Sequence, residues 1–257
     1  MLISQMRKNS IKQKNNFSAA KPTEQTTVEN LRVLFEDNHL IVVHKRSSDI
    51  VQADRTGDPV LSDIIKSYLK KKYNKPGEVF CGTVHRIDRP VSGIVVFAKT
   101  SKALSRLTAL FKSRDVQKTY WAVVSGAPPK NADVVRNFLW KDEALNKSFA
   151  SNQPRGNAKE SELSYQLIGK GEHYSFLEVK PKTGRHHQIR VTLSSIGCPI
   201  KGDVKYGSKR TNPNGGIHLH AREIEFPHPT KNKIVRFVAP VPEDSLWTAF
   251  LSSQFNL

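Results

Sequence analysis

The sequence is most constrained by a polar segment, His85 to Gly93, that separates two short apolar runs. The runs, Val79 to Val84 and Ile94 to Ala98, are rich in β-branched and aromatic residues, so each is a predicted strand. Within the segment, Pro90 removes a backbone donor and stops a strand ladder. The pattern therefore predicts two strands joined by a loop that carries charged side chains.

Asp88 is the candidate reactive residue of this loop, and it lies between Arg86 and Arg89. A carboxylate held between two fixed positive charges stays ionised. An ionised carboxylate can act as a nucleophile or as a base, but it is a poor general acid. The local sequence alone favours the plainer role of an ion-paired aspartate that fixes a turn, because structural ion pairs outnumber catalytic ones.

The charge of the chain indicates a polyanionic partner. The 257 residues include 41 Lys+Arg against 23 Asp+Glu, which gives a net charge of +18 and a pI near 9.9. A balance this basic favours nucleic acid as the partner. The two cysteines, Cys81 and Cys198, have no metal-ligand or disulfide-framework spacing, so we expect a reduced, cytoplasmic protein. No apolar run approaches the roughly 20 residues that span a bilayer.

The first 30 residues differ in composition from the rest of the chain. They are rich in Lys, Asn, Gln and Ser, and no acidic residue precedes Glu24. We expect residues 1–30 to be a disordered basic tail that attracts phosphate, and residues 31–257 to be one catalytic domain. A mitochondrial transit peptide is the weaker alternative for the tail, because lysine rather than arginine dominates it.

Hydrophobic periodicity predicts an α+β fold. We expect Asp58 to cap a first helix, with Pro59 in its first turn, and Ser101 to cap a second. Residues 127–160 read as a long excursion or hairpin that faces RNA. The other expected helices are 187–196 and 242–255, and the other expected strands are 31–35, 40–43, 116–126, 163–168, 174–179, 218–226 and 234–238. These strands predict a mixed, mainly antiparallel curved sheet flanked by a few helices.

Four histidines, His186, His187, His218 and His220, raise the question of a zinc site. Adjacent and alternate histidines are not by themselves a metal-ligand pattern, and no Cys/His quartet accompanies them. We therefore expect no metal. Hydrogen bonding or contact with RNA is the favoured role for the pair at 218 and 220.

Four segments together resemble the RluA family of RNA pseudouridine synthases. His85-Arg86-Ile87-Asp88-Arg89-Pro90-Val91-Ser92-Gly93 resembles the family signature His-Arg-Leu-Asp-Arg-x-Thr-Ser-Gly, and residues 118–126 resemble its tyrosine strand. Residues 184–207 are similar to its Gly-Arg-Thr-His-Gln-Ile-Arg and Gly-Asp-x-x-Tyr-Gly segments, and residues 219–229 to its closing strand. The resemblance runs in order from about residue 31 to 245, which makes chance a poor explanation.

The chain departs from the family pattern at three places. Lys45 to Asp49 replaces the usual Lys-Pro-x-Gly, Val91 replaces the Thr before Ser-Gly, and His186 replaces the Thr before His-Gln. The first departure changes a loop, but it leaves the aspartate of the signature in place.

The resemblance implies a chemistry and a set of site residues. It implies a two-part curved sheet with a central cleft, where uridine is isomerised without metal or cofactor. Asp88 would attack the anomeric carbon or act as a base at the ribose, Arg190 would pair with Asp88, and Tyr120 would stack on the uracil and help to remove the C5 proton. Arg86 would fill the gap that the flipped uridine leaves. The remaining residues expected to bind substrate or RNA are His85, Arg89, Arg185, His187, Gln188, Ile189 and Leu219; for Ile189 and Leu219, packing in the core is an equal alternative.

Two other classes of function stay open at this stage. A non-catalytic RNA-binding or ribosome-associated protein would need the same basic charge. A nucleoside or glycosidic hydrolase would need a second, acid-type carboxylate, and none is evident near Asp88. We expect an isomerase that acts as a monomer on rRNA or tRNA.

Overall fold

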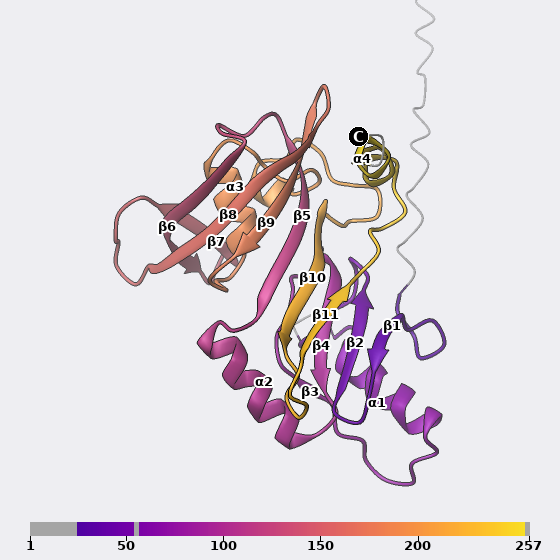
Figure 1. Ribbon diagram of the computed structural model, residues 1–257. Coiled ribbons are helices and arrows are strands. Elements are labelled where there is room, and N and C mark those ends of the chain that lie inside the picture. The colour runs from indigo at the N-terminus through magenta and orange to yellow at the C-terminus, as the bar shows by residue number, and fades with distance from the viewer. Residues whose placement is uncertain (1–24, 54–56, 255–257) are drawn as a thin grey trace, which may run out of the picture.

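A computed structural model describes residues 25–53 and 57–254 (Figure 1). Most of the predicted tail, residues 1–24, lies outside the described residues. Its last part, residues 25–30, packs against the domain: Thr26 is buried, and its hydroxyl donates to the carboxylate of Asp49 at 2.7 Å. No helix of the described part of the chain is long and apolar enough to cross a membrane.

The fold is α+β, as the sequence predicts, and is built on one eleven-stranded sheet. The strands follow the order β1-β2-β4-β10-β5-β9-β8-β6-β7, while β3 pairs with β4 and β11 with β10. The strands are β1 (Val33–Glu36), β2 (Leu40–Lys45), β3 (Gly82–Thr83), β4 (Ser92–Ala98), β5 (Gln117–Ser125), β6 (Ala132–Asp142), β7 (Lys147–Ser151), β8 (Lys159–Lys170), β9 (Tyr174–Pro181), β10 (Leu219–Pro227) and β11 (Ile234–Val238). The helices are α1 (Leu61–Lys72), α2 (Ser101–Ser113), α3 (Gln188–Ser195) and α4 (Ser245–Gln254), with a short 3-10 helix at Val204–Tyr206.

The sheet has two lobes joined by the long strand β5 (Figure 1). One lobe holds β1 to β4, β10 and β11 with α1 and α2, and the other holds β6 to β9 with α3. The segment 127–160, predicted as an excursion or hairpin, supplies the β6–β7 hairpin and the start of β8. The two lobes give the curved, two-part sheet that the resemblance implies.

The strands β4 and β10 form the one parallel pair among the described strands, and they meet beside the Asp88 loop. Gly93 has a φ of 119°, and a Cβ at this position would lie on the backbone of Ala221 in β10. A side chain would therefore push the two strands apart. Glycine at 93 lets β4 leave the loop in close contact with its partner.

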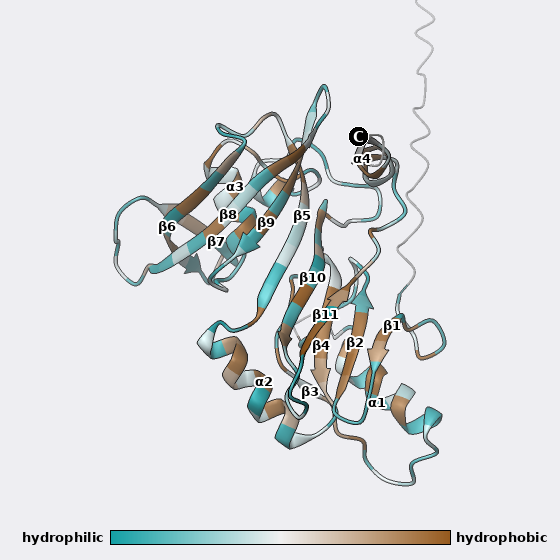
Figure 2. Ribbon diagram, in the orientation of Figure 1, coloured by the Kyte–Doolittle hydropathy of each residue, from teal (hydrophilic) through white to brown (hydrophobic). Residues whose placement is uncertain are grey.

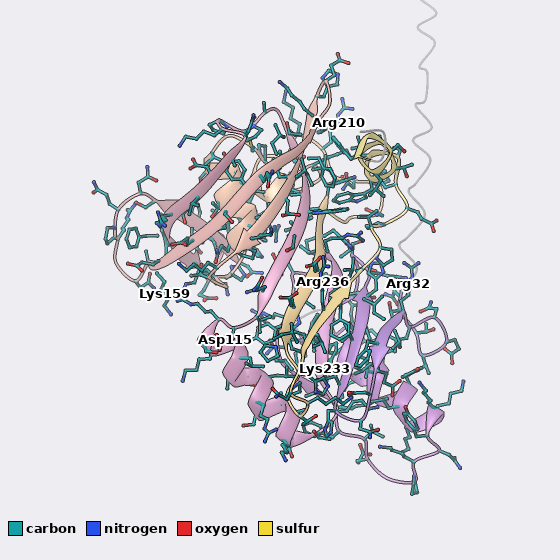
Figure 3. The ribbon with its side chains drawn as sticks, viewed as in Figure 1. Arg32, Asp115, Lys159, Arg210, Lys233 and Arg236 are labelled. Atoms are coloured by element: carbon teal, nitrogen blue, oxygen red, sulfur yellow. The ribbon has the colours of Figure 1, made fainter. Side chains whose placement is uncertain are left out.

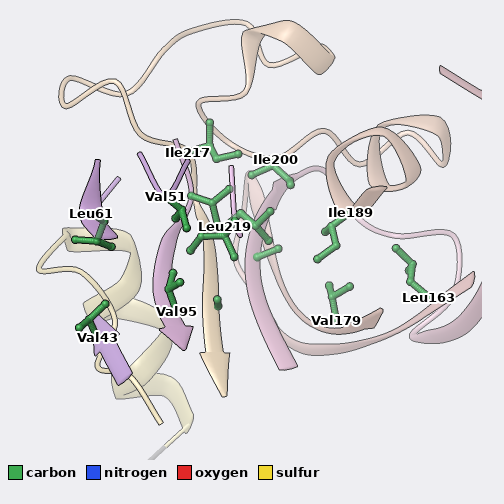
Figure 4. Packing of buried hydrophobic residues seen from close by; sticks show 14 of the residues in the cluster. Val43, Val51, Leu61, Val95, Leu163, Val179, Ile189, Ile200, Ile217 and Leu219 are labelled. Carbon is green, nitrogen blue, oxygen red and sulfur yellow. The ribbon is translucent and has the colours of Figure 1, made fainter. Parts of the chain in front are cut away.

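Strands β2 and β4 are buried along their whole length because helices cover both faces. On one face Val43 and Val95 join a cluster with the α1 residue Leu61 (Figure 4). On the other face Val42 and Val96 pack with α2. Strands buried on both faces read as continuous apolar runs rather than as alternating patterns. Figure 2 shows β2 and β4 as largely hydrophobic.

Both predicted helix caps are wrong. Helix α1 begins at Leu61 after Val60, which has no side-chain cap. Val60 is instead held extended by a bridge to Ile50, and Asp58 pairs with Arg89 at 2.5 Å.

The second cap lies one residue earlier than predicted, at Thr100, whose hydroxyl accepts a hydrogen bond from the Ala103 amide. The predicted strand before the Asp88 loop is also shorter than expected, because only Gly82–Thr83 pairs with β4.

Candidate active site

The loop that carries Asp88 joins β3 to β4 and is fixed by backbone hydrogen bonds. The Val91 amide donates to the Asp88 carbonyl at 3.0 Å, which closes a turn. The Ile217 amide donates to the Pro90 carbonyl at 3.0 Å and ties the turn to the segment before β10. The position of Asp88 is therefore set by the two strands that meet at Gly93.

Lys45, at the end of β2, supports the same loop from inside the protein. Its side chain is fully buried, and Nζ donates to the carbonyls of Arg46, Arg89 and Val91 at 2.8, 3.0 and 2.8 Å. Burial lowers the pKa of Lys45 to about 7, although the charges of Asp49 and Asp88 oppose this. Three carbonyl acceptors match the three N–H groups of an ammonium. Lys45 thus joins the first hairpin to the loop of Asp88.

Arg190, on α3, orients the carboxylate of Asp88. Its Nη1 donates to Asp88 Oδ2 at 3.0 Å, while Nε and Nη2 donate to the two oxygens of Asp203 at 2.7 and 2.8 Å. Burial alone would lower the pKa of Arg190, but Asp203, helped by Asp88, raises it above its ordinary value. The predicted Arg190–Asp88 pair is present. The two hydrogen bonds to the carboxylate of Asp203 hold the guanidinium of Arg190 in the orientation that reaches Asp88.

The two arginines that flank Asp88 in sequence have other contacts. Arg86 Nη1 donates to the side-chain oxygen of Gln52 at 2.8 Å, and Arg89 pairs with Asp58. Both side chains are exposed. The expectation that Asp88 is held between its sequence neighbours is replaced by pairing with Arg190, 102 positions later in the chain.

Asp88 opens into a cavity of about 540 Å³ between the two lobes. Tyr120 on β5 lines this cavity, as does the segment 181–190 that leads into α3. Burial and the charge of Asp88 raise the pKa of the Tyr120 phenol above its ordinary value, so the phenol is protonated at neutral pH. The volume falls in the range of small-molecule sites, and the aromatic ring offers a stacking surface.

The cavity wall is strongly basic. Among the residues that line it, Asp88 is the single acidic side chain. The Lys and Arg residues in the lining are Arg86, Lys112, Arg114, Lys118, Lys182, Arg185 and Arg190. In Figure 3, the labelled residues Asp115, just past α2, and Lys159, at the start of β8, mark the two lobes between which the cavity lies. A cavity with this balance favours an anionic ligand.

A stacked histidine pair lies beside Asp88. His187 has a φ of 52° as it begins α3, and its ring stacks on His186 with centroids 3.8 Å apart. His187 Nδ1 lies 2.8 Å from the hydroxyl of Tyr206, and Nε2 faces Asp88 Oδ2 at 3.7 Å. Burial lowers the pKa of His187 to about 3, against the opposing charge of Asp88. The predicted His187 therefore adjoins the carboxylate as a neutral ring.

Two predicted apolar residues line the cavity and also belong to the core. Ile189 on α3 and Leu219 at the start of β10 are 7% and 3% exposed, and both join the largest hydrophobic cluster. The two alternatives for these residues, a pocket wall and core packing, hold at once. They form the apolar wall of a cavity that is otherwise lined mainly by polar and charged residues.

Three more predicted binding residues have their polar atoms engaged within the protein. His85 Nε2 accepts from the Val96 amide at 3.0 Å, and its ring stacks on Phe111. The amide of Gln188 bonds to Thr183, to the Arg185 amide and to the Glu162 carbonyl. Arg185 Nε donates to the Glu160 carbonyl at 2.9 Å. These contacts shape the cavity wall, so their first role is to hold the site together.

The histidines at 218 and 220 lie in the interior, where the alternative of contact with RNA is wrong and hydrogen bonding is correct. His220 Nδ1 lies 2.8 Å from the hydroxyl of Ser92. His218 bonds to Asn212 and to Asp244, at 2.9 and 3.0 Å. Among the residues that the structure describes, no group of three or more His, Cys, Asp or Glu could hold a metal ion.

Sequence reasoning missed three residues of this site: Lys45, His186 and Asp203. Asp203 lies in the quoted Gly-Asp-x-x-Tyr-Gly segment, and an acid there could have been matched to Arg190. The charged residue at 45, at the end of β2, was a second available signal, since a buried lysine must find partners. His186 was noted as one of four histidines and as a departure from the family pattern, but it was not assigned to the site.

Comparisons with known proteins identify the family of this chain. Residues 39–195 match the family model described as RNA pseudouridylate synthase. The chain is 33% identical to ribosomal large subunit pseudouridine synthase C of Vibrio parahaemolyticus, over 81% of this chain and 65% of that protein. It is also 33% identical to ribosomal large subunit pseudouridine synthase D of Zymomonas mobilis, over 83% of this chain and 70% of that protein. The chain thus spans about two thirds of the length of these relatives.

Solved structures share the fold. The human RNA pseudouridylate synthase domain containing 4 superposes with a TM-score of 0.71 at 24% identity, covering 87% of this chain and 93% of that one. The human RNA pseudouridylate synthase domain containing 1 superposes with a TM-score of 0.67 at 24% identity, covering 88% of this chain and 90% of that one. With the match of the family model across the Asp88 loop and α3, this chain belongs to the RNA pseudouridylate synthase family.

Proposed function

We propose that this protein is an RNA pseudouridine synthase that isomerises uridines in structured RNA, with ribosomal RNA as the first candidate and tRNA as the second. The observation that carries the proposal is the pair Asp88–Arg190, set beside Tyr120 in a cavity whose other charges are positive. The names of the similar bacterial proteins, which refer to the large ribosomal subunit, support rRNA as the substrate.

The proposed reaction breaks the bond between C1′ and N1 of uridine and forms a bond between C1′ and C5. The C5 proton leaves and N1 gains a proton, so the atoms balance without a metal or an organic cofactor. Asp88 supplies the anion beside the anomeric carbon, either as nucleophile or as base at the adjacent ribose position. Arg190 keeps the carboxylate pointed into the cavity. Tyr120 stacks on the uracil, while Ile189 and Leu219 form the apolar wall.

The surrounding residues disfavour a glycosidic hydrolase. Such enzymes use two carboxyl groups, one of which protonates the leaving group. Asp203 is the second carboxylate near Arg190, but it is 2% exposed and both of its oxygens accept from the guanidinium. Among the described residues of the cavity wall, Asp88 therefore acts without an acid partner.

A map of pseudouridines tests the proposal. Total rRNA and tRNA from cells with and without the gene are labelled chemically and read by primer extension. We expect the loss of one or a few positions, restored by the unmodified gene and not by Asp88→Asn. Identical maps from both cell lines would contradict a role as a synthase for these RNAs and would favour the non-catalytic RNA-binding alternative.

A further inference from the structure

Lys118 is a cation inside the active cavity with no role in the chemistry above. It lies two residues before Tyr120 on β5, and side chains at positions i and i+2 of a strand share a face. Both residues line the cavity. Two residues of a strand span about 6.6 Å, so Lys118 reaches the cavity at about the length of one nucleotide from the Tyr120 ring.

Lys118 has no anionic partner among the described residues. Arg114, the C-terminal cap of α2, is the charged residue that shifts the pKa of Lys118, and it has the same sign. Burial, with the charge of Arg114, lowers the pKa of Lys118. His85, also close by, is a neutral ring, because burial and the charge of Lys118 lower its pKa to about 3. A half-buried cation beside another cation is unfavourable unless a ligand supplies the anion.

The lining cations of the segment between β9 and α3 have partners within the protein. Lys182 pairs with Glu162 at 3.1 Å, and Arg185 donates to the Glu160 carbonyl. On the side next to α2, Lys112, Arg114 and Lys118 form no ion pair with any carboxylate among the described residues. Asp115, the acid adjacent in sequence, is exposed and accepts from the Ser113 hydroxyl. Three of the lining cations that have no ion pair among the described residues thus come from one stretch, 112–118, at the end of α2 and the start of β5.

We propose that Lys118, with Arg114, forms a phosphate subsite that binds a phosphodiester of the nucleotide whose base stacks on Tyr120. This inference rests on the proposed function, because it takes uridine as the occupant of the Asp88 pocket. The subsite selects a nucleotide within a strand over a free nucleoside. It converts the energy of one phosphate contact into alignment of the ribose with Asp88.

Binding of small ligands to the full-length protein tests the subsite without any turnover. Calorimetry compares uridine with uridine 5′-monophosphate and uridine 3′-monophosphate. We expect one of the phosphates to tighten binding about tenfold, the equivalent of about 1.4 kcal/mol. Lys118→Met should lose this gain and Lys118→Arg should keep it. The matched control is Lys170→Met, which removes the same charge from an exposed position at the end of β8 and should keep the full gain.

Two further readouts separate a phosphate contact from a structural role. The slope of log affinity for RNA against log salt should fall by about 0.7–0.9 in Lys118→Met, with no change in Lys170→Met. The melting temperature of Lys118→Met should stay level or rise, because the variant removes like-charge repulsion. A gain from phosphate that survives in Lys118→Met, or no gain in the unmodified protein, would overturn the subsite. If the phosphate still tightens binding but the protein forms no pseudouridine, the proposed function is overturned and the phosphate subsite stands.

Discussion

Arg190 is bound to Asp203 through two parallel hydrogen bonds, and this pair lies almost wholly out of contact with water. The geometry leaves one nitrogen of the guanidinium for Asp88. A bidentate pair fixes both the plane and the direction of the arginine. The orientation of Asp88 is therefore determined by a carboxylate that does not line the cavity.

Asp203→Asn should reduce kcat and stability together. The amide keeps the shape but turns N–H groups toward the guanidinium, and removal of one partner of a buried pair costs about 3–5 kcal/mol. We expect kcat to fall at least tenfold while KM for RNA changes little, as measured by pseudouridine formation and urea unfolding. Asp37→Asn is the control, because Asp37 pairs with His228 and Lys231 away from the cavity. Unchanged kcat in Asp203→Asn would remove Asp203 from the positioning of Arg190.

Lys45→Met should uncouple the Asp88 loop from the first hairpin. The variant keeps the length of the side chain and deletes the donors for the carbonyls of Arg89 and Val91. A shift of about 1 Å in a reacting group can cost about 100-fold in rate, so we expect a fall in kcat with nearly normal affinity for RNA. Lys99→Met, which breaks a pair with Glu36, is the control. Equal kcat values for the two variants would show that the loop keeps its place without Lys45.

Stability should decrease as the pH falls below about 6.5. Burial lowers the pKa of His85 and of His220 to about 3, and that of His44 to about 4. These rings stay neutral in the folded protein, whereas the unfolded chain takes up protons below about pH 6.5. The unfolded state then binds more protons, so the free energy of unfolding falls by about 1.4 kcal/mol per pH unit for each ring until the folded pKa is reached.

Urea unfolding at several pH values between 7 and 4 measures this slope. His85→Gln retains an acceptor for the Val96 amide and cannot titrate, so its slope should be shallower than that of the unmodified protein. His173→Gln, at an exposed position, serves as the control. Parallel curves for His85→Gln and the unmodified protein would contradict a neutral His85 in the folded state.

Tyr120→Phe and Tyr120→Ala should separate stacking from proton transfer. The phenol is protonated in the free protein, since burial and Asp88 raise its pKa, so it can accept the C5 proton only as it passes its own proton on. Phe keeps the ring, so RNA affinity should be nearly normal while release of tritium from C5 of the substrate slows. Ala should also weaken binding, because base–aromatic stacking is worth about 1–3 kcal/mol. Normal tritium release by Tyr120→Phe would leave Tyr120 as a stacking platform only.

The parts of the fold that the sequence predicts well are those with local signals. Apolar runs at 40–43 and 94–98 identify the buried strands, and the patterns at 163–168 and 174–179 identify the paired strands β8 and β9. The parallel pairing of β4 with β10 joins segments more than 120 residues apart, and no local pattern encodes it. The predicted cap at Asp58 was wrong for a related reason: Asp58 can cap a helix or pair with Arg89, and the tertiary contact decides.

The candidate site was predictable where the resemblance names its residues. Asp88, Tyr120 and Arg190 were assigned from motifs, and the structure brings all of them to one cavity. The supporting contacts were not assigned, because they depend on which charges meet across the fold. Arg86 and Arg89 lie within two residues of Asp88 in sequence, yet Asp203 and Lys45 contribute more to its placement.

The most direct test of the account is the activity of Asp88→Asn on an RNA whose modified uridine has been mapped. The variant is nearly isosteric, and Arg190 keeps both bonds to Asp203, so the fold and RNA affinity should be retained. Nucleosides from the treated RNA are separated by chromatography, and pseudouridine is quantified against the unmodified protein. We predict RNA binding within about twofold of normal and no detectable pseudouridine. Normal pseudouridine formation by Asp88→Asn would contradict the assignment of Asp88 as the reactive carboxylate.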